Sequence, residues 1–435
     1  MPYQEPFESS MFQDRRNLLI QRIKEKYPDK TAGIVLLLGN FEREGAVFKQ
    51  DPSFYYLTGI QEPACALVID LATESVTLFV PNFGKEREKW MADAIMLDKG
   101  FEVKYGVDAI KYLGQPCVGY QCYPFFSKQE YADLLAFLEG VIKAGNPIFT
   151  LNPENAREYI EQRYVLQRIA DMVPDFKKSL IDVSYLVHEL RRTKNTREIE
   201  LLYKAIDITI DAQYVLAPEV RPGIIEYELE GLINYIFIGK GGVVAFPSIV
   251  ASGKNSTILH YHHNNKTLQD GELLVVDIGA EYNGYCADIT RTYPVSGTFT
   301  PRQREIYMMV LDTQEYIANL AKPGYWLSNK EQPDKSLYHL AVAYLAQKGY
   351  DKYFLHGIGH FLGIDVHDVG DYKKPLEPGD VITIEPGIYI KEEELGVRIE
   401  DDYWVIEDGV VCMSEQLPKH PDDIEQMMKA QHNEN

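Results

Sequence analysis

The chain has 435 residues, with 44 Lys and Arg against 65 Asp and Glu, so its formal net charge is −21. Hydrophobic residues make up 45% and charged residues 25%, a mixture typical of folded globular proteins and not of disordered ones. The length favours two or three domains. The negative charge argues against nucleic acid or an anionic membrane as the main partner.

The compartment can be judged from the first residues and the cysteines. The start, MPYQEPFESSMFQDRR, lacks a basic segment followed by an apolar run, so a secretory signal is not expected. Apolar stretches such as Ile34–Leu38 are far too short to cross a bilayer. The five cysteines show no CxxC spacing, which favours reduced thiols over a disulfide framework. We therefore predict a cytoplasmic protein without membrane contact.

The first part of the chain, from about 30 to 125, predicts an α/β region. Short apolar runs bounded by Gly, Pro and Asp predict strands, and segments of mixed charge predict helices. The aromatic run Phe54–Leu57 predicts a further core strand with amphipathic tyrosines. The other expected elements are strands at 33–38, 66–69 and 76–80 and helices at 127–140 and across 152–180.

The pattern changes near residue 180, where a charged segment leads into a long helix starting near Thr196. Apolar residues recur every three or four positions from Ile199 to Tyr214, as on the buried face of a helix. Beyond Gly271 the chain is rich in strands, with helices expected at 301–321 and 336–349. We predict two domains, 1–180 and 181–435.

The segment DIGAEYNGYCADITRTYPV contains the first candidate site residues. Asn283-Gly284 is a strong signal for a two-residue hairpin turn, since both positions must take positive φ. Such a hairpin sets Asp277 opposite Thr290 and places Asp288 on the same face as Asp277. Diagonal neighbours lie roughly 7–8 Å apart, which suits two carboxylates that converge on a metal ion. Two aspartates on a solvent-exposed face are the alternative.

A histidine cluster follows in HGIGHFLGIDVHDVG. Three of the ten histidines of the chain, His356, His360 and His367, lie within this stretch. Neutral imidazole is a common metal ligand and a proton carrier near neutral pH. Gly357 and Gly359 disfavour a helix, so this is not the HExxH helix of zinc proteases. A structural role for each histidine is the alternative to ligation.

Acidic residues within apolar segments complete the candidate site. Glu385 ends the run VITIE, where Pro386-Gly387 should interrupt the strand, and Glu400 lies within the expected strand VRIEDDYWVI. A buried carboxylate is costly unless it meets a cation, which is either a metal ion or, for Glu400, an arginine such as Arg398. In ILHYHHNN, His260 is the more probable site residue, and His262-His263 is interpreted as an exposed loop feature.

These residues together resemble a known family. The order Asp277, Asp288, His360, Glu385 and Glu400 is similar to the five metal ligands of the pita-bread metallopeptidases. The surrounding strings resemble the Xaa-Pro aminopeptidase (aminopeptidase P) and prolidase branch, family M24B. The segment QDPSFYYLTGIQEPACALVID resembles the amino-terminal domain of that branch. The resemblance implies an α+β protein: a carboxy-terminal pita-bread catalytic domain preceded by a smaller α/β domain.

The resemblance also implies roles for individual residues. Two divalent ions, typically Mn²⁺, would be held with Asp277 on one ion, His360 and Glu385 on the other, and Asp288 and Glu400 bridging both. A bridging hydroxide would attack the carbonyl before proline, and Glu385 would relay its proton. Other residues would bind substrate or support the site: His260, His367, His356, Arg398 and Tyr389. Zn²⁺, Co²⁺ and Fe²⁺ are alternatives to Mn²⁺.

Three functions remain open at this point. The leading one is an Xaa-Pro aminopeptidase that removes an N-terminal residue from peptides with proline at the second position. The second is a prolidase restricted to Xaa-Pro dipeptides, which would share all five ligands. The third is a non-catalytic binding protein of the same fold. Members of the family are commonly dimers or tetramers, so a homo-oligomer is expected.

Overall fold

The computed structural model describes residues 9–43, 45–83, 87–90, 95, 97, 99–117, 119, 127–153 and 159–429. Its described part divides into two compact units, an amino-terminal unit that ends at Arg191 and a carboxy-terminal unit that begins at Arg192. Strand β6 (Leu180–Asp182) and most of helix α7 (Ser184–Arg192), which follow the predicted boundary near residue 180, belong to the amino-terminal unit. No helix in these ranges is both long and apolar enough to traverse a bilayer.

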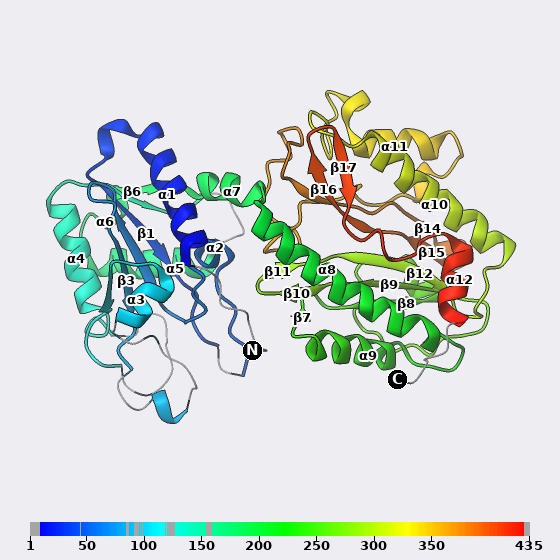
Figure 1. Ribbon diagram of the computed structural model, residues 1–435, viewed down its shortest axis with the longest axis horizontal. Helices are drawn as coiled ribbons and strands as arrows, with labels where there is room; N and C mark the ends of the chain where they lie inside the picture. The colour runs from blue at the N-terminus through cyan, green and yellow to red at the C-terminus, as the bar shows by residue number, and fades with distance from the viewer. Residues whose placement is uncertain are drawn as a thin grey trace. The chain divides into compact units, whose positions relative to one another are not determined.

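The amino-terminal unit is built on a mixed six-stranded sheet in the order β4-β3-β2-β1-β5-β6 (Figure 1). The central strand β1 pairs antiparallel with β2 and parallel with β5. The predicted strands are confirmed as β1 (Ile34–Leu38), β2 (Ala66–Asp70) and β3 (Val76–Val80). The remaining strands are β4 (Ala109–Tyr112) and β5 (Ile148–Thr150).

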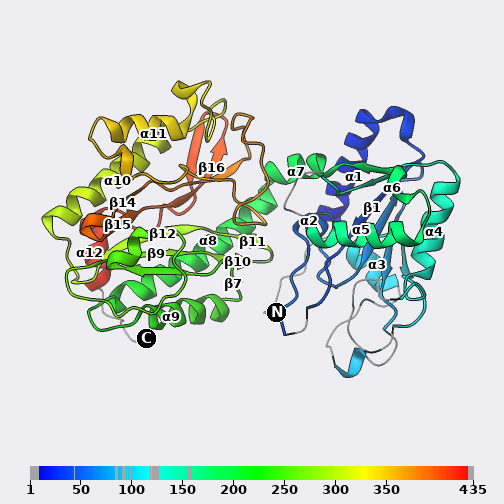
Figure 2. The ribbon, with the colours of Figure 1, turned by 180° about the vertical axis from the view of Figure 1, so that it is seen from behind.

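Helices cover both faces of this sheet, with α1 on one face and α4 and α5 on the other (Figures 1 and 2). The predicted helix at 127–140 begins later, because Lys128–Tyr131 form a turn. The helices of the unit are α1 (Ser9–Lys26), α2 (Pro52–Thr58), α3 (Lys99–Tyr105), α4 (Ala132–Lys143), α5 (Ile160–Met172), α6 (Phe176–Ser179) and α7.

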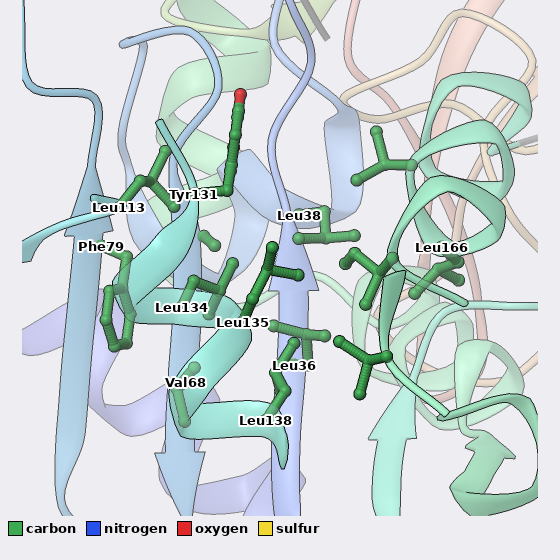
Figure 3. Packing of buried hydrophobic residues seen from close by; sticks show 14 of the residues in the cluster. Leu36, Leu38, Val68, Phe79, Leu113, Tyr131, Leu134, Leu135, Leu138 and Leu166 are labelled. Atoms are coloured by element: carbon green, nitrogen blue, oxygen red, sulfur yellow. The ribbon is translucent and has the colours of Figure 1, made fainter. Parts of the chain in front are cut away.

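One core layer of the unit lies between the sheet and α4 with α5. Leu134, Leu135 and Leu138 of α4 point toward Leu36 of β1, and Leu166 of α5 closes the same cluster (Figure 3). These side chains are at most 3% exposed. Complete burial of a leucine contributes about 1.5–3 kcal/mol to folding, so this layer makes a large contribution to the stability of the unit.

The predicted strand at Phe54–Leu57 is wrong, because this run forms the middle of helix α2. The Asp51 side chain accepts a hydrogen bond from the Phe54 amide at 2.8 Å, and Pro52 occupies the first turn. Gly59, with φ of 67°, ends the helix in the left-handed conformation. Capping at both ends outweighs the strand propensity of three aromatic residues.

The carboxy-terminal unit has several small sheets flanked by pairs of helices, α8 with α9 and α10 with α11 (Figure 1). The helix expected from Thr196 is confirmed as α8, and Asn195 caps it together with Glu198. The helices are α8 (Thr196–Leu216), α9 (Glu226–Gly239), α10 (Pro301–Leu320), α11 (Leu337–Ala346) and α12 (Pro421–Lys429). The helices predicted at 301–321 and 336–349 correspond to α10 and α11.

Four sheets of this unit position the candidate site. Their orders are β12-β9-β8, β11-β10-β7, β13-β16-β17 and β14-β15. The strands are β7 (Val243–Val244), β8 (Ile249–Ser252), β9 (Leu273–Ile278), β10 (Ala280–Tyr282), β11 (Tyr285–Cys286), β12 (Ile289–Pro294), β13 (Val381–Ile384), β14 (Gly387–Ile390), β15 (Leu395–Arg398), β16 (Asp401–Ile406) and β17 (Gly409–Cys412).

Candidate metal centre

Asp277 and Asp288 lie on the hairpin that the sequence predicted. Asn283 and Gly284 both have positive φ, 49° and 80°, and Asp277 pairs with Thr290 across β9 and β12. The two aspartates are 8% and 5% exposed. The alternative interpretation, two aspartates on a solvent-exposed face, is therefore wrong.

Two glycines allow the backbone segments of the site to approach closely. A Cβ on Gly279, between β9 and β10, would lie 1.9 Å from the Ala287 carbonyl oxygen, just before Asp288. A Cβ on Gly359 would lie equally close to the carbonyl oxygen of Thr383 in β13. Only glycine fits at such distances, so both positions bring chain segments that carry acidic or imidazole groups together.

His360 lies in a loop that is not helical, as predicted, and its backbone pairs with Thr383. The Nδ1–H group donates a hydrogen bond to the Phe361 carbonyl oxygen at 3.0 Å. The lone pair is then on Nε2, which lies 3.4 Å from Asp288 Oδ2 and 3.7 Å from Glu385 Oε1. This is the tautomer that a metal-ligating imidazole requires.

Glu385 and Glu400 occupy the ends of strands. Glu385 directly follows β13, as predicted. Glu400 was predicted inside a strand, but it lies in a two-residue break between β15 and β16. There its amide donates to the Thr290 carbonyl oxygen at 3.1 Å, so pairing with β12 replaces the ladder of a continuous strand. Its Oε2 accepts the Thr290 hydroxyl at 2.6 Å.

Arg398 is paired with Asp277 and not with Glu400. Its Nη2 lies 2.6 Å from Asp277 Oδ2, and its Nη1 donates to the Tyr389 hydroxyl at 2.9 Å. Tyr389 in turn lies 2.8 Å from Nε2 of His356. The chain Asp277–Arg398–Tyr389–His356 therefore connects one wall of the site to the other.

The other predicted histidines also line the site. Burial, followed by the charge of Arg398, lowers the pKa of His356 to about 3. Burial, followed by the electrostatic effect of His360, lowers the pKa of His367 to about 4. The rings of His360 and His367 lie 4.2 Å apart. His262, which the sequence interpretation set aside as exposed, lines the same cavity as His260. Its position two residues after His260 was the signal available.

The acidic groups, the histidines and Arg398 border one cavity of about 470 Å³, whereas Tyr389 lies behind its lining. Its polar lining comprises His260, His262, Asp277, Asp288, His356, His360, His367, Glu385, Arg398 and Glu400. Phe246, Pro247, Ile249, Leu259 and Val366 form an apolar part of its wall. A cavity with an apolar wall and convergent charged groups is typical of a substrate site.

The donor set fits divalent metal ions. Ligand atoms of Asp288, His360 and Glu400 all lie within 4.8 Å of one another. Oδ1 of Asp277 and Oδ1 of Asp288 are buried without a hydrogen-bond partner among the described residues. Burial, followed by repulsion from neighbouring carboxylates, raises the pKa of Asp288 and of Glu400 well above their ordinary values. Bound cations would relieve both penalties.

Comparison with known proteins agrees with this geometry. Residues 200–407 match metallopeptidase family M24, and residues 12–116 match the aminopeptidase P N-terminal domain. The Xaa-Pro aminopeptidase of Escherichia coli strain K12 is 32% identical over 96% of this chain and 97% of its own length. The human Xaa-Pro dipeptidase is 29% identical over 96% of this chain and 93% of its own length.

A solved structure extends the similarity to the fold. It is a glutamate-to-alanine variant of E. coli aminopeptidase P in complex with substrate, with a TM-score of 0.82 and 28% identity over 98% of this chain and 99% of that chain. The site is thus that of a metal-dependent hydrolase. The chain belongs to metallopeptidase family M24, which implies divalent metal ions and peptide substrates.

Proposed function

We propose that the protein is an Xaa-Pro aminopeptidase, which hydrolyses the bond between an N-terminal residue and a following proline. The observation that carries this proposal is the convergence of four carboxylates and His360 on one cavity, with unpartnered oxygens on two of the carboxylates. Substrates would be peptides with proline at the second position, as the names of the E. coli and human relatives suggest.

We assign the ligands of two ions as the resemblance implies. Asp277 would hold one ion, His360 and Glu385 the other, and Asp288 and Glu400 would bridge them. An oxygen-rich set with one imidazole suits Mn²⁺. When bound, such ions supply a hydroxide nucleophile at neutral pH and polarise the scissile carbonyl.

The side chains of the protein then perform the remaining steps. Glu385, whose pKa is raised mainly by burial, accepts the proton of the attacking water and returns it to the leaving proline nitrogen. His260 and His367 orient the peptide and donate to the developing oxyanion. His356 lies on the proline side, held by Tyr389, and Arg398 fixes Asp277.

Proline specificity follows from the chemistry of the bond. The amide before proline has no N–H, and the ring restricts the preceding residue. A peptidase that binds an extended backbone loses a donor there, whereas an apolar wall such as Phe246 and Pro247 can receive the pyrrolidine ring.

The experiment compares Xaa-Pro dipeptides with Xaa-Pro-Yaa peptides in the presence of Mn²⁺, with products identified by mass. Cleavage of the longer peptides supports the aminopeptidase. Cleavage of dipeptides alone would identify a prolidase. This second candidate function is considered because of the similarity to the human Xaa-Pro dipeptidase. Absence of both bound metal and cleavage would indicate a non-catalytic binding protein.

We further propose a cytoplasmic homo-oligomer, a dimer or tetramer. The cysteine pattern supports the compartment. Large apolar side chains on the outer face of α9 support self-association: Tyr227, Tyr235 and Ile238 are 53%, 73% and 64% exposed. Light scattering of the purified protein tests the oligomer, and a monomeric mass would contradict it.

A further inference from the structure

A buried carboxylate outside the cavity connects distant parts of the loop that carries His260. Glu226, the first residue of α9, is 0% exposed. Its Oε1 accepts from the Ser252 amide at 2.8 Å, the Ser252 hydroxyl at 2.7 Å and the Asn255 side chain at 3.2 Å. Its Oε2 accepts from the Tyr261 hydroxyl at 2.8 Å and the Lys266 amide at 2.9 Å.

These donors come from the beginning, the middle and the end of the segment 252–266. Because one side chain binds all three parts, it closes the loop onto α9. Asn264 adds a second connection, since its Nδ2 lies 3.0 Å from Glu230 Oε2, one turn further along α9. Only a carboxylate can accept from so many donors, because a glutamine would direct its own N–H groups at some of them.

Tyr261 is the member of this network that lies in sequence between two residues of the cavity wall. Its ring packs in a buried cluster with Ile249, Ala251 and Val275. Both of its chain neighbours, His260 and His262, line the cavity, and their rings stack with centroids 6.2 Å apart. The tyrosine therefore anchors the loop from behind while the two histidines face the substrate site.

We propose that the hydrogen bond between Glu226 and Tyr261 positions His260 and His262 for substrate binding. Both residues are positioning residues, since neither lines the cavity. The inference rests on the proposed function, because it assigns His260 to the substrate. Neither ion would contact this network, whose members are not among the proposed ligands.

The test is Tyr261→Phe, which removes the hydroxyl and keeps the packed ring. Tyr307→Phe is the control, since Tyr307 is also buried and its hydroxyl donates one hydrogen bond, to the Lys419 carbonyl oxygen at 2.8 Å. The Tyr261 hydroxyl also lies 3.2 Å from Asn265 Oδ1 and accepts from the Asn265 amide at 3.4 Å, so Tyr261→Phe removes these contacts as well. We expect Tyr261→Phe to lower kcat/KM for an Xaa-Pro-Yaa peptide about tenfold or more, with a rise in KM. Bound Mn²⁺ per chain should not change, and Tyr307→Phe should keep wild-type kcat and KM.

A double-mutant cycle separates positioning from general loosening. If Tyr261 acts through the two histidines, Tyr261→Phe should cost less than about twofold in a background that already carries His260→Ala and His262→Ala. An undiminished cost in that background, or an equal loss in Tyr307→Phe, overturns the proposal. So does wild-type kinetics in Tyr261→Phe.

A second readout does not depend on activity. In protein labelled with ¹³C-histidine, the ring signals of His260 and His262, assigned from the two alanine variants, should move in Tyr261→Phe and stay in place in Tyr307→Phe. If wild-type protein cleaves no Xaa-Pro bond, the proposed function fails and these signals still test the positioning. Unmoved signals in Tyr261→Phe contradict it.

Discussion

The guanidinium of Arg398 lies 2.6 Å from Oδ2 of Asp277, whereas Oδ1 of the same carboxylate has no hydrogen-bond partner among the described residues. One oxygen is thus fixed by the protein and the other is left available. Arg398 is itself held by Tyr389 and Thr290. The carboxylate is therefore oriented before an ion binds, so binding costs less side-chain conformational entropy.

Loss of a bridging or proton-relaying carboxylate should lower turnover by orders of magnitude while the protein stays folded. We expect Glu385→Ala to lower kcat by about 10²–10⁴-fold, the range typical of general acid–base groups. Asp288→Asn should reduce activity at least as far and also lower the bound metal. Kinetics, metal analysis and circular dichroism measure these effects.

Glu392→Ala is the control for these two variants, because this glutamate is exposed and close in the chain. It should behave as wild type. A wild-type kcat in either site variant, with metal present, would show that the ligand assignment is wrong.

Metal should stabilise the protein more at pH 8 than at pH 5. The pKa values of Asp288 and Glu400 are raised in the folded state, mainly by burial. Folded metal-free protein then retains protons that the unfolded chain releases. The retained protons stabilise the metal-free folded state. Their contribution to the free energy of unfolding is complete below the unfolded pKa, near 4, and is lost as pH rises through the folded pKa. An ion at about 1,000 times its Kd adds about 4 kcal/mol.

Calorimetry with Mn²⁺ or with EDTA at the two pH values measures this difference. The increase in Tm caused by metal should be larger at pH 8, and Asp288→Asn should reduce it. An increase that is equal at both pH values would contradict the proposed origin of the effect.

The acid limit of activity should depend on metal concentration. The pKa values of His356 and His367, lowered mainly by burial to about 3 and about 4, keep both imidazoles neutral between pH 5 and 8. Protonation of the ligands, with release of metal, then sets the limit. Raising Mn²⁺ tenfold should move the acid limb of kcat/KM to lower pH. A limb fixed near pH 6.5 at every Mn²⁺ concentration would instead indicate an ordinary histidine.

Gly359→Ala should destabilise the protein by about 1–3 kcal/mol, the usual cost of overpacking, because its Cβ would meet the Thr383 carbonyl oxygen at 1.9 Å. The displaced loop should also hold metal less tightly through His360. Gly357→Ala is the matched control, since its nearest contact would be an ordinary 3.9 Å. Thermal unfolding compares the two, and equal Tm values would contradict the close contact.

Local signals made much of the site predictable. Asn283-Gly284 determined the hairpin, and the hairpin determined which residue faces Asp277. Pro386 directly after Glu385 marked the end of β13. Each inference depended on backbone geometry within a few residues, which sequence patterns report well.

Long-range contacts were not predictable in the same way. The Thr290–Glu400 hydrogen bond joins residues 110 positions apart, and it accompanies the break that the strand prediction at Glu400 missed. The error at Phe54–Leu57 was different, because the capping residues Asp51 and Gly59 were visible but given less weight than aromatic content. His262 was predicted to be an exposed loop residue without a role in the site, but an exposed side chain can also line an open cavity.

The position of Glu400, where three sheets meet, has one further consequence. It follows β15 of one sheet, precedes β16 of a second, and hydrogen-bonds to Thr290 on β12 of a third. These sheets share no strand, so an ion bound to Glu400 and Asp288 would act as a cross-link between them. Removing the ion should therefore destabilise all three sheets together. Amide hydrogen exchange in β12, β15 and β16 would then accelerate over the same range of chelator concentration.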